Sequence, residues 1–217
     1  MEILVVVAVA TLVGVIALRD VPNYKAHYDD AVEKFNKRGL DFIPWHDMPK
    51  SWGFSIFHYG IPSLFGALRL LWYKRDLDVR GYIAIPTPVN RVSAEWIRGV
   101  VETEENPDKT EPGWILFRKD VSRGYFGQSW KQQSRLAGKA GEVVLNVAEV
   151  VWALRVYRYA RQERLCEDFF VRTRSIGPNG QHLVVGLFSE EFGIVVDEMS
   201  DDGHEKVGLA TGHLFLS

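Results

Sequence analysis

The chain has 217 residues, of which 47% are hydrophobic and 25% are charged, and its formal net charge is −2. These proportions are ordinary for a globular protein, and the sequence contains no internal repeat and no low-complexity segment. The length allows one or two domains, and the single cysteine, Cys166, excludes an intramolecular disulfide framework.

The chain opens on a long apolar stretch. Residues 3–18 carry no charge, and Thr11 and Gly14 are the only mildly polar residues among them. The run is too long for one strand, since strands usually have about 3–10 residues, and it lacks the polar stripe of a soluble helix. As a helix it is roughly 24 Å long, close to the length that spans a bilayer. We therefore expect a transmembrane anchor over residues 1–20. A buried core element and a processed signal segment are the alternatives.

Basic residues close to this run all follow it. They are Arg19, Lys25, Lys34, Lys37 and Arg38. Because Lys and Arg near a span favour the cytoplasmic side, we expect a single-pass membrane protein with a cytoplasmic body and a short tail outside.

The N-terminal stretch EILVVVAVATLVGVIAL, followed by VPNYKAHYDDA, resembles the N-terminal helix of type IV pilins and pseudopilins. In that family a Glu opens a Val/Ile/Ala-rich helix, and a Pro-x-Tyr segment with more helix follows. The likeness covers residues 2–31. The chain departs from the family in placing its Glu second and in interrupting the run with Arg19 and Asp20. The resemblance implies a pilin-like subunit with its body outside the cytoplasm.

Residues 21–78 are expected to form a helical and membrane-interfacial segment. The spacing of apolar residues predicts an amphipathic helix over 24–38, with Gly39 just after its end. An aromatic-rich stretch at 51–75 follows a Pro-punctuated loop, and it predicts a helix that lies in the membrane interface, in the protein core or across the membrane. The residues expected at the interface are Trp52, Phe54, Phe57, Trp72 and Tyr73.

Residues 79–217 are expected to form an α+β globular body. A strand is predicted over 80–86 and ends at prolines, and a hairpin is predicted from 95–105 and 113–121, although its first arm also suits a helix. A long helix is expected over 142–164, with carboxylates in its first half and arginines in its second. Four strand-like runs follow, at 169–174, 181–188, 192–199 and 207–216. The predicted fold class is thus α+β. An N-terminal single transmembrane helix precedes a mixed body, which has a long amphipathic helix and a C-terminal antiparallel sheet.

Charge is unevenly distributed along the body. Residues 118–174 hold twelve basic and six acidic side chains, whereas residues 175–217 hold one and seven. Basic residues interleaved with aromatic rings bind phosphate backbones or anionic lipid headgroups, and they also pair with carboxylates of the same fold. The candidate contacts for an anionic ligand or lipid are Arg155, Arg158, Arg161, Arg164, Arg172 and Arg174.

We find no set of residues that defines a reaction. The six histidines lack the four-residue spacing of a helical metal pair, and the acidic stretch 197–205 lacks the pattern of a calcium-binding loop. Cys166 stands among carboxylates and is expected to be a packed structural thiol. We therefore expect no enzymatic activity, no catalytic residues, no cofactor and no metal.

These features favour a non-enzymatic, single-pass membrane protein that acts as an accessory or scaffold subunit of a larger membrane-associated assembly. Its partners would be membrane lipids and other protein subunits. A second interpretation is a membrane-anchored sensor that binds an anionic ligand or nucleic acid through residues 118–174. The pilin-like subunit is the third.

Overall fold

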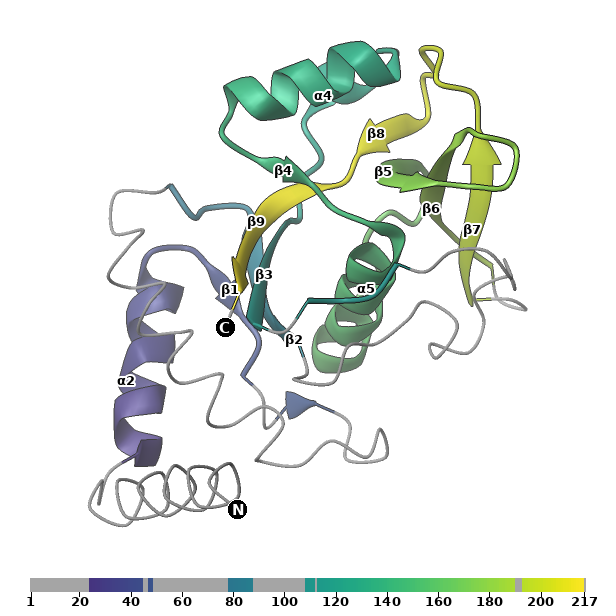
Figure 1. Cartoon of the computed structure of the whole chain (residues 1–217). Coiled ribbons are helices and arrows are strands. Elements are labelled where there is room, and N and C mark those ends of the chain that lie inside the picture. Colours follow the sequence, from purple (N-terminus) through teal and green to yellow (C-terminus); the bar gives the residue numbers. More distant parts are fainter. Residues whose placement is uncertain are drawn as a thin grey trace, which may run out of the picture.

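The chain folds into two β-sheets with one helix packed between them (Figure 1). A computed structural model describes residues 24–44, 47–48, 78–87, 108–111, 113–189 and 193–216. The mixture of sheets and few helices confirms the predicted α+β class. The expected anchor at 1–20 and the aromatic segment at 51–75 lie outside the described residues. Among the residues that are described, no helix has both the length and the apolar character needed to cross a bilayer.

The first sheet has five strands in the order β1-β2-β3-β9-β4. They are β1 (Asp41–Phe42), β2 (Tyr82–Thr87), β3 (Gly113–Arg118), β4 (Val143–Val144) and β9 (Thr211–Leu216). β1 runs parallel to β2, and the other neighbouring strands are antiparallel. Successive side chains of a strand point to opposite faces, and both faces of β2 and β3 are buried in separate apolar clusters.

Helix α2 (Tyr24–Lys37) contributes to the cluster on one face of this sheet, as the sequence predicts a helix here. The ring of Phe35 stacks on Phe42 at 5.5 Å, and Phe42 packs on Trp114 at 4.7 Å. Gly39 follows the helix with a φ of +80°, a conformation that favours glycine. The predicted end of the helix is therefore confirmed.

The second sheet has four strands in the order β7-β6-β5-β8. They are β5 (Phe170–Ile176), β6 (His182–Ser189), β7 (Gly193–Met199) and β8 (Val207–Leu209). β5, β6 and β7 are antiparallel, whereas β8 runs parallel to β5. The expected C-terminal antiparallel sheet is thus a mixed sheet.

The predicted strand 207–216 is in fact two strands that belong to different sheets. Ala210 separates β8 from β9, and its N–H donates to the carbonyl of Arg172 in β5 at 2.9 Å. The Ala210 carbonyl accepts from Leu145, beside β4, at 3.0 Å. One residue therefore bonds to both sides of the junction, where the chain passes from the second sheet to the first.

Helix α5 (Val147–Arg161) lies between the two sheets and shares a core with both (Figure 1). The helix expected over 142–164 begins later, because Asn146 caps it. The Asn146 side chain accepts from the N–H of Glu149 at 2.8 Å, and Glu149 accepts from the N–H of Asn146 at 2.7 Å. Val143 and Glu142, which were expected inside the helix, precede it, and Val143 pairs with Gly212 of β9.

Two short helical elements of the described chain were not predicted from the sequence, the single turn η3 (Arg123–Tyr125) and helix α4 (Trp130–Lys139). Gln133 and Ala137 are the buried residues of α4. The Gln133 amide donates to the carbonyls of Tyr125 and Val207 at 2.7 and 3.0 Å. This amide ties α4 to η3 and to the second sheet.

β2 continues through Pro86, where the sequence predicts its end. Pro86 is paired with Trp114 of β3, and Thr87 is paired with Gly113. On the other side, the register of β1 with β2 stops at Ala84. A proline is tolerated here because β1 no longer pairs with β2 at this position.

Substitution of Leu154 by Ala tests the packing of α5. Leu154 has no exposed surface, so its truncation is expected to lower the free energy of unfolding by about 2–5 kcal/mol. Leu136→Ala in α4 is the matched control, because that side chain is 36% exposed, and it should cost less than about 1 kcal/mol. Denaturant titration of the full chain in mild detergent measures both. Equal losses would contradict a central position for α5.

Candidate functional site

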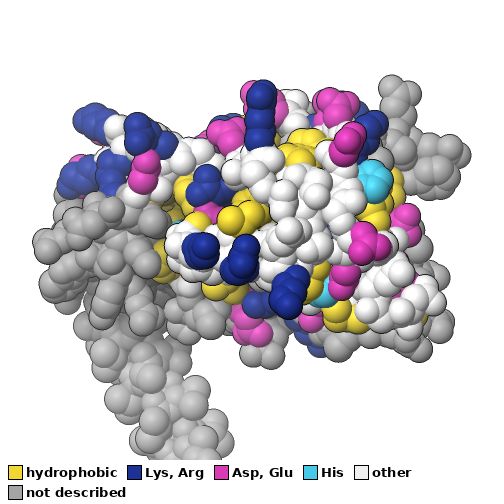
Figure 2. Space-filling view, turned by 90° about the horizontal axis from the view of Figure 1, so that it is seen from above, with side chains coloured by type: hydrophobic (Ala, Val, Ile, Leu, Met, Phe, Trp, Pro, Cys, Tyr) yellow, Lys and Arg dark blue, Asp and Glu magenta, His cyan; other side chains and the backbone are white. Residues whose placement is uncertain are grey.

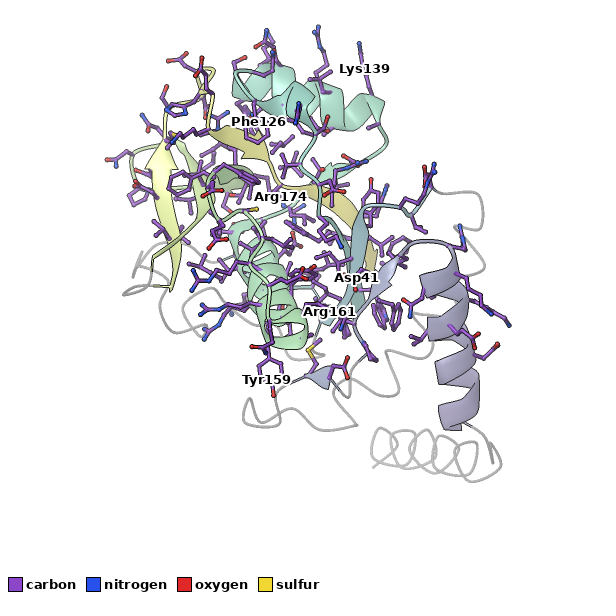
Figure 3. All side chains as sticks on the ribbon, turned by 180° about the vertical axis from the view of Figure 1, so that it is seen from behind. Asp41, Phe126, Lys139, Tyr159, Arg161 and Arg174 are labelled. Atoms are coloured by element: carbon purple, nitrogen blue, oxygen red, sulfur yellow. The ribbon has the colours of Figure 1, made fainter. Side chains whose placement is uncertain are left out.

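Arg161, one of the six predicted contact arginines, bonds within the fold. Its guanidinium donates to one carboxylate oxygen of Asp41 at 2.9 and 3.0 Å and to the carbonyl of Phe42 at 2.9 Å. Lys119 lies 3.4 Å from the other carboxylate oxygen of Asp41. Figure 3 shows Arg161 and Asp41 together at one end of α5. These bonds tie the C-terminal end of α5 to β1.

Arg174 lies at the other end of α5 (Figure 3). Its guanidinium is 3.3 Å from the carboxylate of Glu149, whose side chain is fully buried. Burial raises the pKa of Glu149, while the N–H of Asn146 and the charge of Arg174 act in the opposite direction. Arg174 therefore supports a buried carboxylate that also caps the helix.

Arg172 is completely buried. Its guanidinium donates to the side-chain oxygen of Gln133 at 2.7 Å and to the carbonyls of Ser200 and Asp202 at 2.6 and 3.1 Å. Burial lowers the pKa of Arg172, and the charges of Asp201 and Asp202 oppose that shift. The side chain holds the turn after β7 against β5 and α4.

The six arginines do not come together as one surface. Arg161 and the Glu149 partner of Arg174 are twelve positions apart in α5, which is roughly 18 Å along a helix. Arg158 is exposed and Arg155 is half-buried, and Arg164 pairs with Glu167 at 3.3 Å. The predicted interfacial residues Trp52, Phe54, Phe57, Trp72 and Tyr73 lie outside the described residues.

A buried group of ionisable side chains around Glu142 was not predicted from the sequence. The Glu142 side chain is 1% exposed and accepts hydrogen bonds from the Tyr82 hydroxyl, from Arg118 at 2.6 Å and from the Tyr125 hydroxyl at 3.3 Å. Burial works against the charged form, yet bonds from Tyr82 and Arg118 hold the pKa of Glu142 below its usual value. This network joins β2, β3 and η3.

The tyrosines of this network are poor acids. Burial, together with the charge and hydrogen bond of Glu142, raises the pKa of Tyr125 to about 12 and raises that of Tyr82 further. Both hydroxyls thus stay protonated and donate to the carboxylate. The asparagine cap signal at 146–149 places Glu142 before the helix, and this signal could have separated it from α5 in the sequence.

Helix α4, which the sequence did not predict, arranges three basic residues of the segment 118–174 in a row on the surface. Lys131, Arg135 and Lys139 recur at a spacing of four residues and are all exposed. We call these three residues the basic row. Figure 2 shows dark blue side chains along this face of the molecule, and Figure 3 shows Lys139 pointing away from the body.

Cys166 is a packed thiol, as the sequence predicts. It is 5% exposed and belongs to the core around α5. Burial raises the pKa of its thiol to about 12, so the thiolate is disfavoured near neutral pH.

Comparison with known proteins finds no match to this chain among protein-family models, curated proteins or solved structures.

Substitution of Glu142 by Gln tests the buried network. The change leaves Arg118 and two tyrosines without their charged acceptor. It should therefore lower the free energy of unfolding by about 1–3 kcal/mol near neutral pH. Glu163→Gln is the matched control, because exposed Glu163 also accepts from a tyrosine hydroxyl, that of Tyr157, at 2.7 Å. That control should cost less than about 1 kcal/mol.

The native chain and Glu142→Gln should differ in their free energy of unfolding by an amount that depends on pH, because the pKa of Glu142 is shifted. Because that pKa is lower in the folded chain than its usual 4.5, the carboxylate adds stability above this pH and loses it as the pH falls through the folded value. The difference in free energy of unfolding between the native chain and Glu142→Gln should therefore decrease below about pH 4.5. A pH-independent difference in denaturant titrations would contradict the assignment.

Proposed function

We propose that this chain is a non-enzymatic, single-pass membrane protein whose cytoplasmic body is an accessory or scaffold subunit of a larger membrane-associated assembly. The observation that carries the proposal is the uncharged run of residues 3–18, which five basic residues follow. A run of this length suits a membrane-spanning helix. The order of the basic residues favours a cytoplasmic body.

The scaffold role is supported by the hydrogen bonds that the buried ionisable side chains of the described body form. Glu142, Glu149 and Arg172 are each bonded to groups of the chain itself. The bonds of Glu142 and Arg172 connect different elements of the fold, and Glu149 caps α5 and pairs with Arg174 of β5. Such contacts favour a rigid body that presents its surface to partners, and the partners we propose are membrane lipids and other protein subunits.

Two alternatives remain as proposals. A membrane-anchored sensor of an anionic ligand or nucleic acid is supported by one observation, because the exposed basic row lies within residues 118–174. A pilin-like subunit is supported by the resemblance of residues 2–31 and requires a body outside the cytoplasm. Isolation of the full chain in mild detergent distinguishes the scaffold, since a scaffold subunit migrates on size exclusion as part of a large complex.

Alkaline carbonate washing tests the anchor. The full chain should stay in the membrane, and a chain that begins at Asn23 should be released. Val9→Arg should reduce the inserted fraction, because a central arginine costs about 2.5–3.5 kcal/mol on insertion scales. Val9→Leu is the matched control and should insert normally. Release of the full chain would show that residues 1–20 are not an anchor.

A reporter fused after Ser217 tests the side of the membrane on which the body lies. A fluorescent protein that matures only in the cytoplasm should be bright, because the basic residues near the run all follow it. A phosphatase that is active only in an oxidising compartment should be silent at the same position. The opposite pair of results would reject the cytoplasmic body and favour the pilin-like subunit.

A further inference from the structure

The basic row is a surface that the fold does not need. The buried side of α4 is formed by Gln133 and Ala137, while Lys131, Arg135 and Lys139 are exposed. Within the described part of the chain, these three residues form no ion pair. Like charges four positions apart destabilise a helix. Lys131 also lies in the first turn of α4, where the helix dipole disfavours a cation.

Carboxylates lie beside the N-terminal end of the same helix. The turn at residues 200–206, which we call the acidic turn, carries Asp201, Asp202 and Glu205 together with Lys206. All four are exposed. Figure 2 shows magenta carboxylates beside the row of dark blue side chains. This face of the molecule therefore has a positive part and a negative part next to each other.

Both parts are held in fixed positions. The N–H of Trp130, the first residue of α4, donates to the carbonyl of Asp201 at 2.8 Å. The buried Arg172 guanidinium bonds to the carbonyls of Ser200 and Asp202. His182 bonds to the Asp201 carboxylate at 2.6 Å and stacks on the ring of Trp130 at 3.7 Å. The acidic turn and the basic row thus keep a constant relation to each other.

We infer that this face binds a second copy of the chain in a two-fold symmetric dimer. A two-fold rotation places the basic row of each copy against the acidic turn of the other, so every contact between unlike charges is made twice. Because the basic row and the acidic turn of each copy are then both paired, the assembly closes at two copies.

The acidic turn argues against an extended polyanion on this face. A nucleic acid backbone or a lipid surface laid along the basic row would meet the carboxylates that adjoin its end. Like charges placed opposite each other weaken association. A second copy avoids this repulsion because it brings both signs of charge. The inference concerns the described body and does not depend on the anchor.

Co-purification of two differently tagged full-length copies in mild detergent tests the dimer. At about 0.1 M salt the screening length is about 10 Å, whereas at about 1 M it is about 3 Å. Native copies should therefore co-purify at the lower salt concentration, and the recovered partner should fall at least about tenfold at the higher one. Absence of co-purification at low salt would reject the dimer.

Charge reversal identifies the surface. Lys131→Glu with Arg135→Glu makes the face predominantly negative, and Asp202→Lys with Glu205→Lys makes it predominantly positive. Each variant should lose pairing with itself, and the two variants should pair with each other because their faces are complementary. This recovery also shows that both variants are folded. The matched control, Lys34→Glu with Lys37→Glu on α2, should pair normally.

Two further outcomes would overturn the inference. If each reversed variant still pairs with itself, association uses another surface, such as the anchor. If the reversed basic row changes only the retention of the chain on a polyanion such as heparin, while pairing is unaffected, the row serves an anionic ligand instead of a second copy.

Discussion

Helix α5 must be covered on nearly all sides, and this requirement determines the arrangement of the rest of the fold. Every residue from Val147 to Leu154 is buried, as are Val156 and Tyr157. A helix that is apolar all round is stable in water only inside a core. The two sheets supply that core from opposite sides, with Ile83 and Phe117 from one and Val171 and Leu183 from the other. Each fully buried aliphatic side chain contributes about 1.5–3 kcal/mol relative to exposure.

Polar side chains attach the ends of α5 to different sheets. At its N-terminal end, Glu149 pairs with Arg174 of β5. At its C-terminal end, Arg161 bonds to Asp41 of β1. Between them, the indole N–H of Trp152 donates to the carbonyl of Pro86 in β2 at 3.1 Å. These bonds are directional, so they fix the position of a helix whose apolar contacts alone would allow sliding.

The chain itself is continuous between the two sheets. Because β8 and β9 are separated by a single residue, a displacement of one sheet would strain the other at Ala210. Gly212, just beyond this junction, has no room for a side chain, since an added Cβ would lie 2.1 Å from the carbonyl oxygen of Leu116. Close approach of β9 to β3 therefore requires glycine here.

Local signals in the sequence predicted α2, β2, β3 and the core of α5, because periodicity and turn residues specify each of them over a short window. The same signals could not place Ala210, since the pattern of residues 207–216 suits one strand as well as two. Residues brought together from distant positions were also missed. Tyr82, Arg118 and Glu142 meet only after β2, β3 and β4 have joined one sheet.

The arginines illustrate a different limit. Composition identified residues 118–174 as basic, but it could not distinguish the buried Arg172 from the exposed Arg158. α4 was missed because it is short and contains Gly138, and glycine is a poor helix former. The sequence also does not show that the basic residues of α4 lie next to the acidic turn. Only the structure places that turn beside Trp130, the first residue of the helix.

Native-state hydrogen exchange on the full chain in mild detergent tests most directly whether the two sheets and α5 form one cooperative unit. Amides of α5, of β3 in the first sheet and of β6 in the second should exchange with the same, highest free energy of opening. They should also lose protection together as denaturant is added. If β3 and β6 instead open with clearly different free energies, the two sheets unfold independently, and α5 does not unite them.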